Sequence, residues 1–166
     1  MADYTLLYVL VGIFVGITII VNAYIFSYKT SYTPTYRGIN NTNRLLPSSY
    51  VIATVWTVLV ALMAYSQWLV YSKLSTQKTN QHIWKLYLIP FLFIYCVLYP
   101  FYTMGFRNKK IIDFANVFTI ILSGFIAWSI YDITHFGSYM IFLTTIWSAF
   151  ATFATFATFA SNSKII

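Results

Sequence analysis

Apolar residues run through this chain in five long blocks separated by short polar segments. The blocks cover residues 4–28, 49–72, 83–104, 111–131 and 138–160. Each reaches the length of about 20 residues that an α-helix needs to cross the hydrocarbon core of a bilayer. None alternates apolar and polar residues as a strand of a membrane β-barrel does. The pattern therefore predicts an all-α integral membrane protein, a single domain of residues 1–166 folded as a five-transmembrane-helix bundle.

Composition agrees with a membrane protein and narrows the possible functions. Hydrophobic residues make up 60% of the 166 residues, and charged residues make up 8%, against about 25% in ordinary soluble domains. The net charge is +7, but the basic residues stand in small groups between the apolar blocks. That distribution is typical of loop charges that set membrane topology, so we expect the lipid bilayer as a partner and no nucleic acid.

The basic residues also predict an orientation. One side of the predicted bundle collects Lys29, Arg37, Arg44, Arg107, Lys109, Lys110 and Lys164, whereas the other has Lys73, Lys78 and Lys85. Because cytosolic loops carry the excess of Lys and Arg, the carboxyl terminus is predicted to be cytosolic and the amino terminus to lie on the opposite side. The longest connection, residues 29–48, is then cytosolic, either as a lid over the bundle mouth or as a flexible linker.

Ionisable side chains are scarce within the apolar blocks. Asp113 follows a basic group at the start of the fourth block, where an interfacial ion pair or a contact with Asn116 accounts for it. His82 and His135 lie in loops without neighbours at metal-ligating spacing, and Cys96 is the single cysteine. We therefore expect no metal site, no disulfide and no catalytic residue set.

Small and aromatic residues supply the remaining candidates. Gly12 and Gly16 form a GxxxG motif, which allows close approach of another helix, from the same chain or from a second copy in a homodimer. A repeat of Phe and Ala over residues 150–160 predicts a ridge for helix or lipid packing. Trp84 lies at the end of a block, as an interfacial anchor does. Trp56 and Trp147 lie inside their blocks, which indicates either a cavity for a planar ligand or plain core packing.

Three strings in the second block match a known helix pattern. They are Val55-Trp56-Thr57-Val58-Leu59, Leu62-Met63-Ala64-Tyr65-Ser66 and Trp68-Leu69-Val70-Tyr71. Together they resemble the second helix of the TspO/MBR family, the tryptophan-rich sensory proteins and translocator proteins, which reads approximately VWTxLYxxMGxSxxLVW. Thinner agreement follows in the later blocks at Ile112-Asp113, Ala127-Trp128 and Trp147-Ser148-Ala149-Phe150-Ala151.

The resemblance implies a function and a site. Its members are multi-pass proteins of bacterial membranes or the mitochondrial outer membrane that bind a porphyrin or another tetrapyrrole, or a sterol, in the bundle cavity, with a receptor, sensory or transport role. The ligand-binding residues that it implies are Trp56, Ser66, Trp147, Ala149 and Phe150, together with Tyr95, which replaces a polar family residue. Because Phe91 and Tyr95 stand near the family's glutamine and asparagine, we expect no turnover and no cofactor beyond such a ligand.

A second function class fits the composition equally well. The chain would then be a structural or assembly subunit of a larger membrane protein complex, without a small-molecule ligand, and its aromatic ridge would pack against partner helices. Interior-facing indoles at a cavity favour ligand binding, whereas tight packing there with aromatic rows facing outward favours the subunit.

Overall fold

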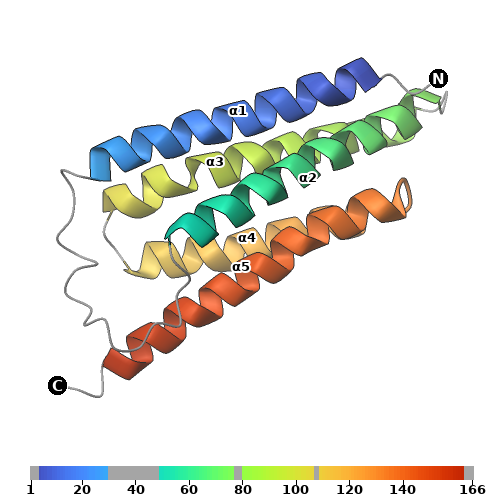
Figure 1. The fold of residues 1–166 in the computed structure, drawn as a ribbon. Helices are drawn as coiled ribbons and strands as arrows, with labels where there is room; N and C mark the ends of the chain where they lie inside the picture. The colour runs from blue at the N-terminus through green and yellow to red at the C-terminus, as the bar shows by residue number, and fades with distance from the viewer. Residues whose placement is uncertain (1–3, 30–48, 77–79, 107–108, 163–166) are drawn as a thin grey trace.

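The computed structural model describes residues 4–29, 49–76, 80–106 and 109–162, with the side chains over most of these ranges. Five α-helices cross the molecule: α1 (Tyr4–Lys29), α2 (Ser49–Thr76), α3 (Leu88–Phe106), α4 (Lys109–Ile130) and α5 (His135–Asn162) (Figure 1). Each is long and apolar enough to span a membrane. No strand occurs in these ranges, so the predicted all-α five-helix bundle is confirmed.

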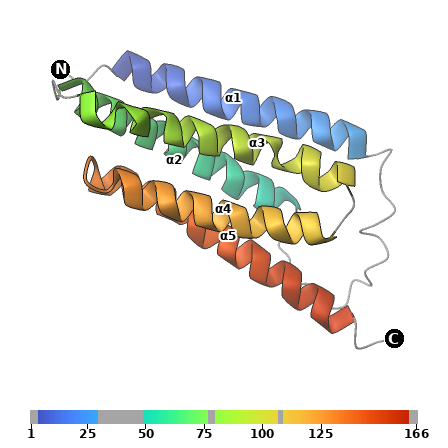
Figure 2. The same ribbon diagram turned by 180° about the vertical axis from the view of Figure 1, so that it is seen from behind.

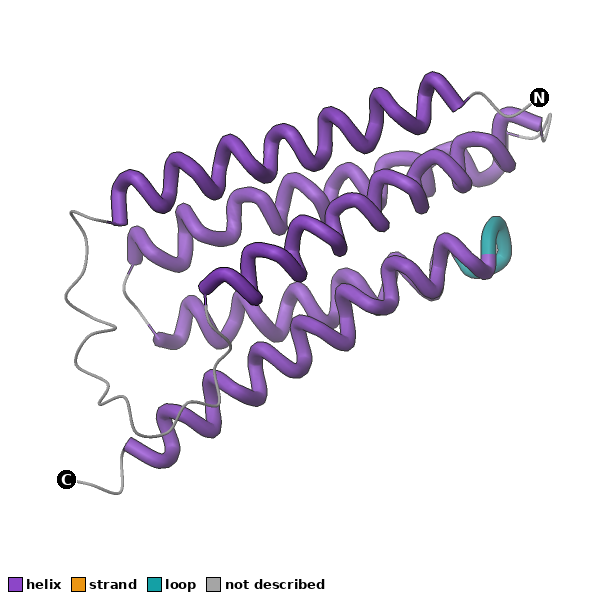
Figure 3. Tube along the Cα trace, in the orientation of Figure 1, coloured by secondary structure: helices purple, strands orange, loops and turns teal. Residues whose placement is uncertain are grey.

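Successive helices run antiparallel, and α2 packs between α1 and α5 (Figures 1 and 2). We call the two ends of the bundle after α1, which starts at the Tyr4 end and finishes at the Lys29 end. The Tyr4 end also holds the turn of residues 131–134 between α4 and α5, drawn teal in Figure 3. The Lys29 end receives the start of α2 and the finish of α5.

The chain enters α3 through a 3-10 helix, η1 (Asn80–Tyr87), whereas the sequence pattern predicts one continuous span from residue 83. Pro90 explains the change, because it has no N–H and its ring crowds the carbonyl of the residue four positions earlier, Leu86. That carbonyl instead accepts a hydrogen bond of 3.0 Å from Nε2 of Gln67 on α2. A side chain of one span thus pairs the backbone group that proline leaves free in another.

The most deeply buried apolar side chains belong to four helices. Met63 of α2, Ile89 and Leu92 of α3, Ile126 of α4 and Ile141 of α5 are all 0% exposed. The outer surface is apolar too, with Tyr8, Ile20, Phe114, Trp128 and many similar side chains largely exposed. A soluble protein rarely exposes contiguous apolar surface of this extent, so the outside of the bundle is suited to lipid.

The GxxxG motif of α1 does not pack within the described part of the chain. A Cβ atom added at Gly12 or Gly16 would meet no atom within 4 Å. The expected close contact with another helix of the same chain is therefore not made there, and contact with a second copy stays a prediction. The first connection, with its two interpretations as lid or linker, lies outside the described residues apart from Lys29.

Candidate functional site

Trp56 and Trp147 lie at one level of the bundle. Oγ of Ser66 on α2 donates a hydrogen bond of 2.9 Å to the carbonyl of Gly137 on α5, which sets the register between these antiparallel helices. Trp56 is ten residues from Ser66, and Trp147 is ten residues from Gly137, both toward the Lys29 end. At a rise of about 1.5 Å per residue, each indole lies roughly 15 Å from that hydrogen bond along its helix.

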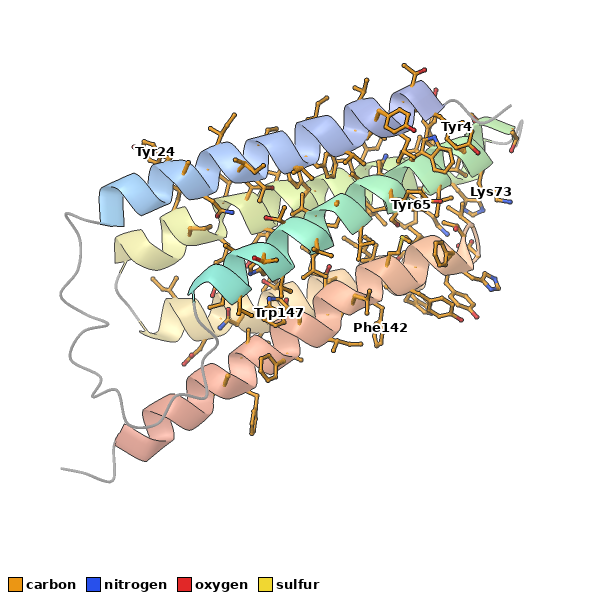
Figure 4. All side chains as sticks on the ribbon, viewed as in Figure 1. Tyr4, Tyr24, Tyr65, Lys73, Phe142 and Trp147 are labelled. Atoms are coloured by element: carbon orange, nitrogen blue, oxygen red, sulfur yellow. The ribbon has the colours of Figure 1, made fainter. Side chains whose placement is uncertain are left out.

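The two indoles are both half-buried, but their surroundings differ. Trp56 packs against the buried apolar core. The ring of Trp147 packs on Phe150 with ring centroids 5.6 Å apart. Figure 4 shows Trp147 on the side of α5 that faces α2, whereas Phe142 points away from the bundle. Nε1 of Trp147 is buried and has no hydrogen-bond partner among the described residues, although buried indole N–H groups usually have one.

Thr144 and Ser148 share the face of α5 that carries Trp147. Their side chains are buried, and neither hydroxyl has a hydrogen-bond partner in the described part of the chain. Sequence analysis missed both residues. Their spacing could have identified them. Thr144 and Ser148 are four residues apart, so they lie on successive turns of one helix face, and they flank Trp147 in the sequence.

Tyr95 lies in the contact between α3 and α4. Its hydroxyl donates to the carbonyl of Ala115 at 3.1 Å, and its ring packs on Phe118 with centroids 5.1 Å apart. The Tyr99 hydroxyl donates to the side-chain oxygen of Asn116. Tyr95 is therefore part of a polar contact on the α4 side of the bundle, and its hydroxyl is engaged with the backbone of α4.

The side-chain oxygen of Asn116 accepts a hydrogen bond from the Tyr99 hydroxyl. Oδ1 of Asp113 is buried without a hydrogen-bond partner among the described residues. The side chains of the basic residues that precede Asp113 lie outside the described part of the chain. The alternative prediction, an interfacial ion pair of Asp113 with one of them, therefore stays a prediction.

Ser66 and Ala149 are placed away from the level or the face of the two indoles, whereas Phe150 contacts one of them. Ser66 is 0% exposed at the crossing of α2 and α5, where the helices are so close that a Cβ added at Gly137 would lie 3.0 Å from its Oγ. Ala149 is exposed, because two residues after Trp147 a helix has turned by about 200°. Phe150 touches Trp147 but is 45% exposed.

The Tyr4 end is held by a partly buried ion pair. Nζ of Lys85 in η1 lies 2.8 Å from each carboxylate oxygen of Asp132 in the turn between α4 and α5. The side chain of Lys85 is 9% exposed and that of Asp132 is 56% exposed. The hydrogen bond from Lys85 lowers the pKa of Asp132 below its usual value. Trp84 beside them is half-exposed, as expected for an interfacial anchor.

The Phe and Ala repeat of α5 separates into an outer and an inner row. Phe150, Phe153 and Phe156 are exposed, whereas Ala154 is buried. These three rings therefore face outward and Ala154 faces the bundle, which agrees with a ridge for lipid or partner helices. No group of three or more His, Cys, Asp or Glu side chains that could hold a metal occurs among the described residues.

Residues 5–160, nearly the whole chain, match the model of one protein family, described as the TspO/MBR family. No curated protein and no solved structure matches the chain. The family match includes α2, where the sequence resemblance is densest, and it extends over most of the four other helices.

Proposed function

The chain belongs to the TspO/MBR family, and from this premise we propose that it binds an apolar planar ligand, a tetrapyrrole or a sterol, between α2 and α5. It is an integral multi-pass membrane protein, and ligand binding would serve a sensory or transport role. The single observation that carries the proposal is the placement of Trp56 and Trp147 at one level of two adjacent helices.

The proposed site would combine stacking with hydrogen bonding. Indole rings offer large, rigid apolar surfaces against which a planar ring system can pack. The unpaired Nε1 of Trp147 and the unpaired hydroxyls of Thr144 and Ser148 lie on the same helix face and supply the few polar groups that orient a ligand in a mostly apolar site. Ser66 and Ala149 are not part of the proposed site, because Ser66 is buried at the crossing of α2 and α5 and Ala149 is exposed on the outside of α5.

We propose binding without turnover. The polar helix-three residues of the family are replaced by Phe91 and Tyr95 in this chain, and Phe91 is 54% exposed on the outside of α3. The Tyr95 hydroxyl is already bonded to the carbonyl of Ala115. A reacting ligand between α2 and α5 would therefore find neither of them as a free polar group at its side.

Orientation, membrane and self-association are parts of the proposal. The loop charges favour a cytosolic carboxyl terminus and an amino terminus on the opposite side. Family resemblance favours a bacterial membrane or the mitochondrial outer membrane. The open face at Gly12 and Gly16 would fit a second copy of the chain in a homodimer.

Equilibrium binding of protoporphyrin to the purified protein tests the proposal. The absorbance of the porphyrin reports binding, so that removing an indole does not change the signal. Trp56→Leu and Trp147→Leu should each weaken binding, by roughly tenfold, because stacking is worth about 0.5–1.5 kcal/mol beyond area burial. Trp128→Leu is the matched control, since Trp128 is 76% exposed on the outer face of α4; Trp84→Leu is a second. Equal binding by all four variants, or no binding of protoporphyrin or cholesterol by the wild type, would refute the proposal.

The outward row of Phe150, Phe153 and Phe156 favours a second candidate, a structural or assembly subunit of a larger membrane complex. Native electrophoresis of gently solubilised membranes tests it. If the Phe row contacts partner helices, Phe153→Ala should release the chain from a larger assembly, while Phe142→Ala on another exposed position of α5 should not. A chain that migrates alone in all cases would rule out this candidate.

A further inference from the structure

Three hydrogen-bond donors on one turn of α5 are buried without an acceptor among the described residues. They are Oγ1 of Thr144, Nε1 of Trp147 and Oγ of Ser148. Thr144 is 0% exposed and Ser148 is 5% exposed, so bulk solvent does not pair them. Thr144 lies one turn before both Trp147 and Ser148, which are about 100° apart around the helix, so the three groups lie within an arc of about 100°. Buried polar groups are nearly always paired in native proteins, and an unpaired cluster therefore calls for an external partner.

Several other hydroxyls of the described helices are paired, whereas Thr144 and Ser148 are not; Ser129 Oγ on α4 is likewise buried without a partner among the described residues. In an apolar helix a Ser or Thr side chain commonly bonds to the carbonyl four residues earlier. That bond is made, at 2.7–2.9 Å, by Thr18, Thr57, Thr119, Ser123 and Thr152. Thr144 and Ser148 do not make this bond, and so their donors have no partner among the described residues.

The neighbouring helices do not supply the missing acceptor. By the register of Ser66 and Gly137, the level of Thr144 and Ser148 corresponds to Val55–Leu59 on α2, whose Trp56 and Leu59 side chains offer apolar surface. On α4, the hydroxyls of Thr119 and Ser123 donate to the backbone of their own helix, and Oγ of Ser123 also pairs with Oγ1 of Thr145 on α5 at 2.9 Å, so neither is paired with the three donors. The hydroxyl of Thr57 in the same stretch donates to the carbonyl of Ala53 on its own helix, so the three donors find no partner there among the described residues.

The chemistry of these donors selects a neutral acceptor. Of the Lys side chains in the described part of the chain, Lys73 is exposed and Lys85 is paired with Asp132 at the Tyr4 end. A carboxylate brought to the donors would lose its hydration without gaining a counter-charge from the described side chains, which is far more costly than burying a neutral carbonyl. A carbonyl oxygen accepts hydrogen bonds from hydroxyl and indole N–H groups alike.

We propose that Thr144, Trp147 and Ser148 form a donor patch that binds a neutral carbonyl oxygen on the ligand. The patch makes the site selective for apolar ring ketones, of the kind found on oxidised sterols, over hydrocarbons and over anionic carboxylates. This inference rests on the proposed function, because it assigns the polar contacts of the same site.

Two probes that differ by one oxygen test the donor patch: cholest-4-en-3-one and cholest-4-ene, each measured by equilibrium binding to the purified protein. The wild type should bind the ketone more tightly. The double variant Thr144→Val with Ser148→Ala keeps the volume nearly unchanged and should bind the ketone about fivefold to tenfold more weakly, with the affinity for the hydrocarbon unchanged. Thr152→Val is the matched control, since that buried hydroxyl bonds to the carbonyl of Ser148 on its own helix.

A second measurement needs no ligand. Removing unpaired buried hydroxyls should raise the unfolding temperature of the free double variant, whereas Thr152→Val removes a paired hydroxyl and should lower it. A lower unfolding temperature for the double variant would mean that the hydroxyls are paired in the free protein, and would overturn the donor patch.

The possible outcomes separate this inference from the proposed function. Equal wild-type affinity for the ketone and the hydrocarbon would overturn the donor patch and leave the proposed function standing. Tighter binding of protoporphyrin than of its dimethyl ester, abolished in the double variant, would assign the patch to a carboxylate and overturn the preference for a neutral oxygen. Binding of none of these probes would refute both proposals.

Discussion

Removing either partner of the ion pair between Lys85 and Asp132 should have unequal effects on stability. The two side chains are held by bonds of 2.8 Å to both carboxylate oxygens, but Lys85 is 9% exposed while Asp132 is 56% exposed. Asp132→Ala leaves a buried ammonium group without its partner. Lys85→Met leaves a carboxylate that water already reaches, and it replaces the ammonium with an apolar side chain of similar length.

The size of the effect follows from the burial of each partner. Breaking a fully buried pair costs about 3–5 kcal/mol, and breaking an exposed pair costs about 0–1 kcal/mol. Because water screens the Asp132 side of the pair, we expect Asp132→Ala to cost about 2 kcal/mol and Lys85→Met to cost under about 0.5 kcal/mol. For a chain of this size, about 2 kcal/mol corresponds to roughly 4–8 °C in the unfolding temperature.

Thermal unfolding in detergent micelles measures these differences, and the double variant is the control. Lys85→Met with Asp132→Ala should regain most of the stability that Asp132→Ala alone loses, because no buried charge is left unpaired. The same pair predicts a pH dependence. Since the folded-state pKa of Asp132 is lowered, its stabilisation is present above the ordinary carboxyl value of about 3.9 and is lost as the pH falls through the lowered value. Equal losses from the two single variants would refute this reasoning.

Three further predictions concern packing and topology. Gln67→Leu should lower the free energy of unfolding by about 1–2 kcal/mol, because it leaves the Leu86 carbonyl unpaired. Adding Pro90→Ala should recover part of this loss, because it restores a backbone N–H, and equal unfolding temperatures of the wild type and Gln67→Leu would contradict the prediction. Gly16→Leu should leave the unfolding temperature of the monomer unchanged, since nothing lies within 4 Å of an added Cβ, and any drop in oligomer size on gel filtration would identify a second copy at this face. In a Cys96→Ala background, a cysteine at position 37 should be labelled from the cytosolic side and one at position 78 from the other side; the reverse pattern would overturn the predicted orientation.

The outline of the fold was accessible from the sequence because membrane spans are a local property. The apolar block of residues 4–28 became α1 (Tyr4–Lys29), and the block of residues 49–72 became α2 (Ser49–Thr76). Length and apolarity alone decide whether a segment can cross a bilayer as a helix, and neither depends on what the segment packs against. The family was likewise recognisable, because the residues that carry the resemblance lie within one helix.

Some details were local but were not read from the sequence. Pro90 cannot donate an α-helical hydrogen bond to the carbonyl four residues earlier. The change from η1 to α3 next to it could therefore have been expected from the sequence. The outward direction of Ala149 and the inward direction of Thr144 follow from the helical turn of about 100° per residue once Trp147 is taken as facing inward. The resemblance implied site residues from one continuous stretch of α5. Successive residues of a helix point in different directions, so the residues of such a stretch cannot all face one site.

Only the tertiary structure decided how the helices stand relative to one another. The hydrogen bond from Ser66 to Gly137 joins residues 71 positions apart, and it sets the register that brings Trp56 level with Trp147. The pair of Lys85 and Asp132 spans 47 positions. The unpaired donors on α5 likewise became apparent only when the neighbouring helices were in place. Rise and turn per residue fix the inside of each helix, but register between helices depends on contacts between distant residues, and no local pattern of the sequence contains it.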